Sequence, residues 1–245
     1  MATLFISDLH LCDTRPAVTD LFIEFLRRDA RHAEALYILG DFFEYWIGDE
    51  AVDQAEHRPV VDALRALTDA GVPTYLMHGN RDFLMGSGFA AASGCRLLPD
   101  PTVVDLYGTR VLLTHGDTLC TDDVEYLEFR QSVRNEQWQR QFLALPVFER
   151  EAIARNYREK SRESTSMKAA DIMDVTQRAV ETAMREHRVH HLIHGHTHRP
   201  AEHVFTLDGA RAYRTVLGDW HDQGSVLRCS GSDWKLTTLP LTLTT

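Results

Sequence analysis

The sequence has few of the features that mark zinc-knuckle, disulfide-stabilised or membrane-spanning proteins. Its 245 residues include four cysteines, and none of them lies in a Cys-x-x-Cys pair, which argues against a zinc knuckle. A chain of this length can build a core without disulfides. No apolar run reaches the roughly 18 residues that span a bilayer. We therefore expect reduced thiols, a cytoplasmic location and no transmembrane anchor.

A secretory signal is also missing from the start of the chain. The first residues lead directly into Thr3–Ile6, which has the pattern of a strand. Cleavage of this segment would also remove Asp8 and His10, which are candidate metal ligands. We therefore expect no cleaved leader.

Basic residues are in the minority, whereas histidine is abundant. The chain has 26 Lys and Arg against 36 Asp and Glu, a formal net charge of −10 at pH 7. Such a surface repels the phosphates of nucleic acids, so we expect no DNA or RNA partner. The 44% hydrophobic fraction supports one large domain with an insertion. The thirteen histidines direct attention to metal ligands.

Short apolar runs that end in polar residues indicate buried strands, and amphipathic stretches between the early ones indicate helices. This alternation predicts an α/β fold with helices on the faces of a sheet. Ligands bind such sheets at the carboxyl ends of the strands. The predicted strands are Leu4–Ile6, Ala35–Leu39, Thr74–Met77, Val111–Thr114 and His191–Ile193, and the predicted helices are Ala17–Arg31 and Val60–Ala70.

The sequence becomes helical from Asp123 to about Arg188. Apolar residues there recur at helical spacing, as at Trp138, Phe142 and Leu145. Residues 128–168 contain nine Lys or Arg and six Glu, a net charge of +3 in an acidic protein. We predict a core of residues 1–122 and 189–245 and a helical cap of residues 123–188 that receives an anionic substrate. The alternative is a solvated helical hairpin.

Four further strand-like segments follow Pro200, and we expect them to complete a second sheet. They are His203–Phe205, Ala212–Leu217, Val226–Cys229 and Trp234–Leu239.

Five polar motifs begin at or just after the predicted strands. Taken singly they are weak, because a lone Gly-Asp is usually a turn and an isolated His is more often a core residue. Together they offer Asp, Asn and His side chains for two divalent ions that share one carboxylate. The motifs are Asp8-Leu9-His10, Gly40-Asp41, Gly79-Asn80-Arg81-Asp82, His115-Gly116-Asp117 and Gly195-His196-Thr197-His198.

This set of side chains suits hydrolysis of a phosphate ester or anhydride. Two cations about 3.5–4 Å apart clamp phosphate oxygens and activate a bridging water as the attacking hydroxide. Carboxylate and imidazole without thiolate suit Mn²⁺ or Fe²⁺, with Zn²⁺ as an alternative. Asp41 is the natural bridge, since each of its oxygens can contact one ion.

From Asp8 to His198 the motifs resemble those of the calcineurin-like metallophosphoesterases. The resemblance implies a four-layer αββα sandwich with a dinuclear site at the edge of the sheets. It also implies that Asp8, His10, Asp41 and His198 hold one ion and that Asp41, Asn80, His115 and His196 hold the other.

Arg81 departs from that family, which usually has His at this position to protonate the leaving group. Arginine is effectively always charged, so it cannot act as a general acid, but it can stabilise charge on a phosphate. A phosphate leaving group needs no proton, because its second pKa is about 6. We therefore predict catalytic roles for Asn80 and Arg81 in cleaving a pyrophosphate. The alternative is that Arg81 only binds substrate while water supplies any proton.

The segments around the motifs are similar to the UDP-2,3-diacylglucosamine diphosphatases of lipid A synthesis. This resemblance implies attack at the α-phosphorus of an acylated UDP-sugar, with two Mn²⁺ ions, to give UMP and 2,3-diacylglucosamine 1-phosphate (lipid X). It also implies peripheral contact with the cytoplasmic face of the inner membrane. The segments are residues 40–49, 79–83, 115–123 and 217–220, and the implied substrate contacts are Asn80, Arg81, Asp123, Ser161, Thr165, Lys168 and His196.

Some assignments stay open at this point. Asn is familiar where this chain has Thr165. The cap residues Trp138, Phe142, Phe148 and Ile153 form an acyl groove or pack the cap onto the core. A soluble dinucleoside polyphosphate or cyclic nucleotide hydrolase would need no such groove. A non-catalytic scaffold would be expected to have lost metal ligands.

Overall fold

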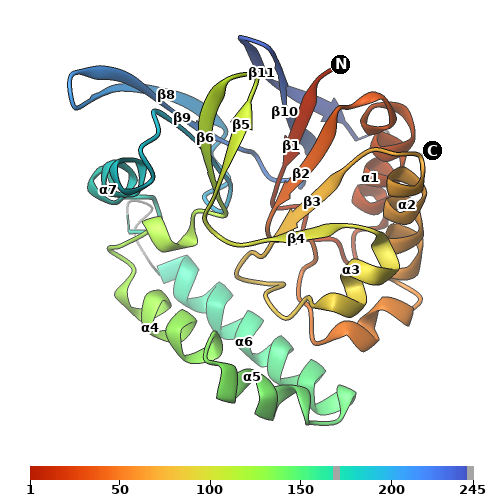
Figure 1. Ribbon diagram of the computed structural model, residues 1–245. Coiled ribbons are helices and arrows are strands. Elements are labelled where there is room, and N and C mark those ends of the chain that lie inside the picture. The colour runs from red at the N-terminus through yellow and green to blue at the C-terminus, as the bar shows by residue number, and fades with distance from the viewer. Residues whose placement is uncertain (168–171, 242–245) are drawn as a thin grey trace.

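Two β-sheets pack face to face between helices in the computed structural model, which describes residues 1–167 and 172–241 (Figure 1). The first sheet has the order β11-β10-β1-β2-β3-β4 and the second the order β5-β6-β7-β9-β8. The first comprises β1 (Thr3–Ile6), β2 (Ala35–Leu39), β3 (Thr74–Met77), β4 (Arg96–Leu98), β10 (Gln223–Ser230) and β11 (Asp233–Pro240). The second comprises β5 (Thr102–Leu106), β6 (Thr109–Thr114), β7 (His191–His194), β8 (Ala201–Leu207) and β9 (Ala210–Val216).

Helices cover the outer faces of both sheets, and a further group lies beyond the strand ends. In chain order the helices are α1 (Pro16–Arg28), α2 (Arg58–Asp69), α3 (Ser87–Ser93), α4 (Val124–Val133), α5 (Glu136–Leu143), α6 (Val147–Met167) and α7 (Gln177–His187). The first three cover the first sheet, and α7 covers the second (Figure 1).

The apolar runs form strands because both faces of each strand are buried. Leu4 and Ile6 of β1 belong to the cluster beneath α1 and α2, whereas Phe5 between them lies in the cluster between the sheets. In β6, Leu113 lies between the sheets and Leu112 packs with α7. Successive side chains point to opposite faces of the sheet, so one apolar run contributes residues to two hydrophobic clusters. The predicted four-layer αββα architecture is confirmed.

Parallel pairing brings the carboxyl ends of several strands to one edge. Strands β1 to β4 are parallel neighbours, as are β6, β7 and β9. These ends face the helices α4, α5 and α6 (Figure 1). The loops that carry the polar motifs therefore meet beneath the cap.

The predicted strands and helices all exist, but one topological expectation is wrong. Of the four C-terminal segments, only β8 and β9 join the second sheet, whereas β10 pairs antiparallel with β1 in the first. Trp220 holds the connection between β9 and β10 in place. Its backbone N–H donates to Asp8 O at 3.1 Å, and its ring packs against Phe22 and Phe25. Strands β4 and β5 were not predicted, and Pro99 and Pro101 lie between them.

The four helices of the predicted cap pack in two different ways. Val180 and Met184 of α7 belong to the cluster on the second sheet. Phe142 of α5 is buried in the large cluster with the first sheet, and Trp138 stacks on it with ring centroids 4.9 Å apart. Ile153 also packs against that cluster, so these three residues attach the cap to the core. The cap limits of 123–188 stay a prediction.

Within residues 1–167 and 172–241, no helix combines the length and the apolarity that crossing a membrane requires.

Phe5→Ala should lower the free energy of unfolding by about 3–5 kcal/mol, because it removes a fully buried ring from between the sheets. Val204→Ala is the matched control, since Val204 is 51% exposed on β8 and its loss should change stability by less than about 0.5 kcal/mol. Urea denaturation with a chelator present measures both. Equal stability of the two variants would contradict the inter-sheet core.

Candidate metal centre

The loops at the sheet edge have an uncommon backbone conformation. Five of the seven predicted ligands have positive φ, a region that residues other than glycine rarely adopt. Such conformations cost about 1–3 kcal/mol each and persist where the surrounding structure enforces them, often at functional sites. The five φ values are 56° at Asp8, 48° at His10, 50° at Asp41, 67° at His196 and 55° at His198.

Two glycines allow neighbouring loops to touch the carboxylates. A Cβ atom at Gly79 would lie 2.2 Å from Asp41 Oδ1, and one at Gly195 would lie 2.3 Å from Asp8 Oδ2. Any side chain at either position would push a carboxylate out of place. The glycines are therefore needed for close approach, in addition to the turn at Gly40, where φ is 88°.

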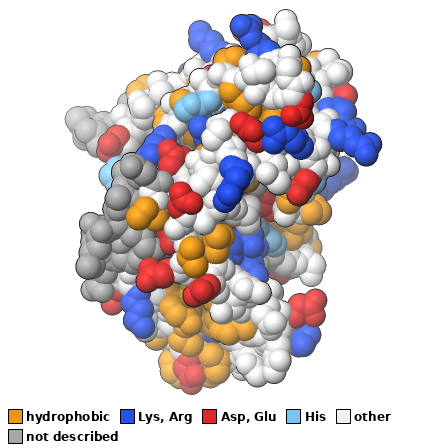
Figure 2. Space-filling view, turned by 90° about the vertical axis from the view of Figure 1, so that its left-hand side faces the viewer, with side chains coloured by type: hydrophobic (Ala, Val, Ile, Leu, Met, Phe, Trp, Pro, Cys, Tyr) orange, Lys and Arg blue, Asp and Glu red, His pale blue; other side chains and the backbone are white. Residues whose placement is uncertain are grey.

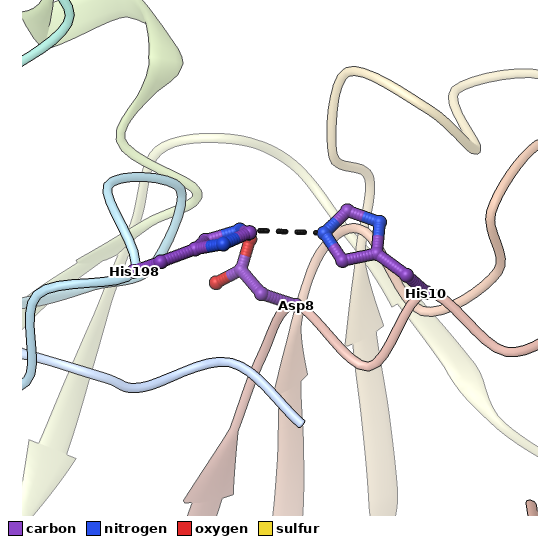
Figure 3. Close-up of side chains that lie close together, drawn as sticks. All are labelled: Asp8, His10 and His198. Carbon is purple, nitrogen blue, oxygen red and sulfur yellow. Dashed lines mark hydrogen bonds and ion pairs between the residues drawn. The ribbon is translucent and has the colours of Figure 1, made fainter. Parts of the chain in front are cut away.

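Three side chains from two loops converge on one point (Figure 3). His198 Nε2 lies 3.3 Å from Asp8 Oδ1 and 3.3 Å from His10 Nε2. Their potential ligand atoms all lie within 4.8 Å of one another. Asp8 Oδ1 is buried and makes no hydrogen bond of good geometry within the described residues. A buried carboxylate oxygen in this state matches a cation ligand.

A second group of side chains meets the first at Asp41. His115 Nε2 lies 3.7 Å from Asp41 Oδ1, and His10 Nε2 lies 3.8 Å from Asp41 Oδ2. Asn80 Oδ1 lies 2.9 Å from His115 Nε2 and 3.0 Å from His196 Nδ1. Asp41 therefore has one oxygen toward each group. With Asp8 and His198, the structure brings all seven predicted side chains together.

Hydrogen bonds behind the site hold these side chains in place. His115 Nδ1 donates to Leu39 O at 2.9 Å, which leaves Nε2 for the centre. Asp82 accepts from Phe42 N and Gly79 N, both at 2.7 Å, and so ties the loop after β2 to the loop after β3. The motif contains Asp82, but its role was not predicted.

Burial and neighbouring charges shift the titration of the centre. Burial raises the pKa of Asp41 to about 7, against the lowering effect of His115. Burial alone would lower the pKa of His115, but the charges of Asp41 and Asp8 outweigh it and raise this pKa to about 9. Burial lowers the pKa of His196 to about 4. Near pH 7 the centre therefore holds protons that a bound cation would displace.

The described residues among the other predicted substrate contacts lie in the loop after β3 and on or next to the helices α4 and α6. Arg81 Nε lies 3.7 Å from Asp41 Oδ2. Asp123 begins α4, and its side chain accepts from Tyr126 N at 3.1 Å. Ser161 is exposed on α6. The side chain of Thr165 and the whole of Lys168 lie outside the described residues.

One group of site residues was not predicted: the face of α4 that contacts the metal loops. Asp117 is fully buried and accepts from Arg130 Nε at 2.7 Å and from the Tyr126 hydroxyl. Arg134 Nη2 donates to Gly79 O at 2.8 Å. Residues 126, 130 and 134 are spaced by four, so they share one face of the helix. This spacing in the sequence would have indicated that one face of α4 contacts the loops after β3 and β6.

The chain matches one family model and is similar to several known proteins. Residues 1–200 match the family model described as calcineurin-like phosphoesterase. A protein of Escherichia coli O7:K1 named UDP-2,3-diacylglucosamine hydrolase is 53% identical over 98% of this chain and 100% of its own length. A protein of the same name from Serratia proteamaculans is 52% identical with the same coverage. A solved archaeal phosphodiesterase aligns with a TM-score of 0.49 and 12% identity, over 98% of this chain and 100% of its own.

Binding of Mn²⁺ to the metal-free protein should release protons at pH 7. His115, with its pKa raised to about 9, is protonated there and must become neutral to act as a ligand. Affinity should therefore rise as the pH increases toward 9. Calorimetry in two buffers of different ionisation enthalpy measures the release. A binding enthalpy that does not depend on the buffer would contradict it.

Proposed function

Because the chain belongs to the calcineurin-like phosphoesterase family, we propose that it hydrolyses the pyrophosphate bond of UDP-2,3-diacylglucosamine at the α-phosphorus. The products are UMP and 2,3-diacylglucosamine 1-phosphate, an intermediate of lipid A synthesis. The observation that carries the substrate assignment is the 53% identity over the full length of a relative with this substrate in its name.

We place two divalent ions at the candidate centre, with Mn²⁺ as the metal. The donor set supports this choice, because it contains carboxylate, amide and imidazole groups and no thiolate. When bound, such ions stabilise charge on phosphate oxygens and lower the pKa of water. One ion would be held by Asp8, His10, Asp41 and His198, and the other by Asp41, Asn80, His115 and His196.

Arg81 and Asn80 would stabilise the charge that develops during cleavage. Arg81 Nη1 lies 3.7 Å from Glu44 Oε1 but makes no hydrogen bond within the described part of the chain, so it keeps capacity for a phosphate oxygen. The oxygen of water bonds to the α-phosphorus while the bond to the bridging oxygen breaks. The lipid phosphate leaves with the electron pair and needs no proton, and the proton of water passes to solvent.

The helices α4, α5 and α6 would receive the acylated part of the substrate and contact the inner face of the membrane. Figure 2 shows hydrophobic side chains gathered at the lower end of the molecule, over these helices. Burial of acyl chains there would contribute about 0.8 kcal/mol per CH₂ group. The large hydrophobic residues exposed on these helices are Val124, Phe129, Leu143, Val147, Phe148 and Tyr157.

We also propose several polar residues as substrate contacts. Apart from His196, which lies in the candidate metal centre, they belong to the predicted cap of residues 123–188. They are Asp123, Ser161, Thr165, Lys168 and His196, in addition to Asn80 and Arg81.

The purified protein with Mn²⁺ should release UMP from UDP-2,3-diacylglucosamine and should cleave a diadenosine polyphosphate far more slowly. Arg81→Ala should reduce turnover more than tenfold and leave the metal content intact, because the guanidinium acts on substrate charge. Arg81→Lys keeps the charge but not the bidentate geometry, so its turnover should lie between those of Arg81→Ala and the unmodified protein. Chromatography of UMP and elemental analysis measure the two effects. Preference for the diadenosine substrate would overturn the substrate assignment, and unchanged turnover in Arg81→Ala would overturn the role of Arg81.

Replacement of Val147 and Phe148 by serine should weaken sedimentation with anionic vesicles at low salt by at least tenfold, since burying even one large apolar side chain contributes about 1.5–3 kcal/mol. Val204→Ser removes an exposed apolar residue from β8, which lies away from α4, α5 and α6 (Figure 1), and should not change sedimentation. If both variants sediment like the unmodified protein, the cap does not contact the membrane.

A further inference from the structure

One carboxylate, that of Glu44, contacts two loops of the candidate metal centre and one helix of the cap. Glu44 lies in the loop after β2, three residues beyond Asp41. Its Oε2 lies 3.5 Å from His10 Nδ1, and its Oε1 lies 3.7 Å from Arg81 Nη1. The same Oε1 accepts a hydrogen bond from Arg158 Nε at 2.8 Å. Arg158 belongs to α6, so the contact joins the cap to the core.

We infer that Glu44 is a positioning residue that orients His10 and Arg81 and makes their orientation depend on the seating of α6. The inference rests on the proposed metal centre but not on the identity of the substrate. Glu44 is absent from the predicted ligands and substrate contacts.

The carboxylate of Glu44 is 3.5 Å from His10 Nδ1, a buried nitrogen that makes no hydrogen bond of good geometry within the described residues. His10 Nε2 points toward His198 and Asp41, whereas Nδ1 points toward Glu44. A carboxylate behind a histidine ligand favours the tautomer with the proton on the far nitrogen, which leaves the near lone pair for the metal. Glu44 would therefore hold His10 ready to bind.

The contacts with the two arginines concern charge. Arg81 and Arg158 approach the same oxygen of Glu44, and the side chains of Glu44 and Arg158 are each only 18% exposed. Removal of the carboxylate would leave two guanidinium groups close together with little solvent to screen them. Arg81 would then move from its place beside Asp41, and α6 would lose one attachment.

The same helix has a second attachment that serves as a control. Arg150 Nη2 donates to Glu50 Oε1 at 2.8 Å, and Arg150 is almost completely buried. In the described part of the chain, both carboxylate oxygens of Glu50 accept hydrogen bonds from Arg150, and Glu50 is not among the predicted ligands. Glu50→Gln thus removes a charge from the interface of α6 with the core and leaves the metal loops alone.

The test is titration of the metal-free protein with Mn²⁺, followed by electron paramagnetic resonance, so that no substrate is needed. Glu44→Gln, which keeps the shape and removes the charge, should weaken binding by about 10–100-fold. Arg158→Met should weaken it at least threefold, because Glu44 then loses its anchor. Glu50→Gln should bind like the unmodified protein. The double variant of Glu44 and Arg158 should bind no more weakly than Glu44→Gln alone.

Thermal unfolding with a chelator present checks that each variant folds. If Glu44→Gln does not fold, Arg158→Met carries the test by itself. Unchanged affinity in Glu44→Gln, or in Arg158→Met, would overturn the inference while the proposed function stands. Equal weakening in Glu50→Gln would also overturn it, since loosening of the cap would then be the cause. If the unmodified protein binds no Mn²⁺, both proposals fall.

Discussion

The metal centre depends on the close approach of the loop after β3 to the carboxylate of Asp41. Gly79 leaves no room for a side chain there, because a Cβ atom would lie 2.2 Å from Asp41 Oδ1. Asp82 holds the same two loops together through hydrogen bonds from Phe42 N and Gly79 N. The backbone N–H of Arg81 donates to Asp41 Oδ1 at 2.9 Å. Asp41 is thereby fixed between two groups of predicted ligands, where a carboxylate shared by two ions would have to lie.

The rest of the fold maintains the energetically unfavourable backbone conformation of the loops at this edge. The loops with positive φ run side by side, with Asp8 N donating to Gly40 O and His10 N donating to Asp41 O, both at 3.0 Å. Behind them the two sheets are packed by fully buried residues, such as Phe5 and Leu39. A closely packed core resists relaxation of the loops. Strain at the site is therefore sustained by packing elsewhere.

Several basic residues of the cap attach it to the core, a role that the sequence did not predict. The positive charge of residues 128–168 predicts a surface that attracts an anionic substrate. In the structure, four of its arginines contact groups of the core. They are Arg130 at Asp117, Arg134 at Gly79 O, Arg150 at Glu50 and Arg158 at Glu44. Much of the charge thus attaches the cap, and the cap in turn contacts the loops that carry the ligands.

Local patterns in the sequence indicated most of the strands, the first two helices, the helical region after Asp123 and the seven converging side chains, whereas the resemblance to a known family implied the αββα architecture. Apolar runs and helical spacing express burial directly, and the motifs follow the strand ends where parallel strands gather their ligands. Only the tertiary structure decided that β10 and β11 join the first sheet, that α7 packs on the second, and that Glu44 lies between His10 and Arg158. These features depend on contacts between residues far apart in the chain, for example 114 positions for Glu44 and Arg158. No local pattern encodes such contacts, because they arise only when packing brings the elements together.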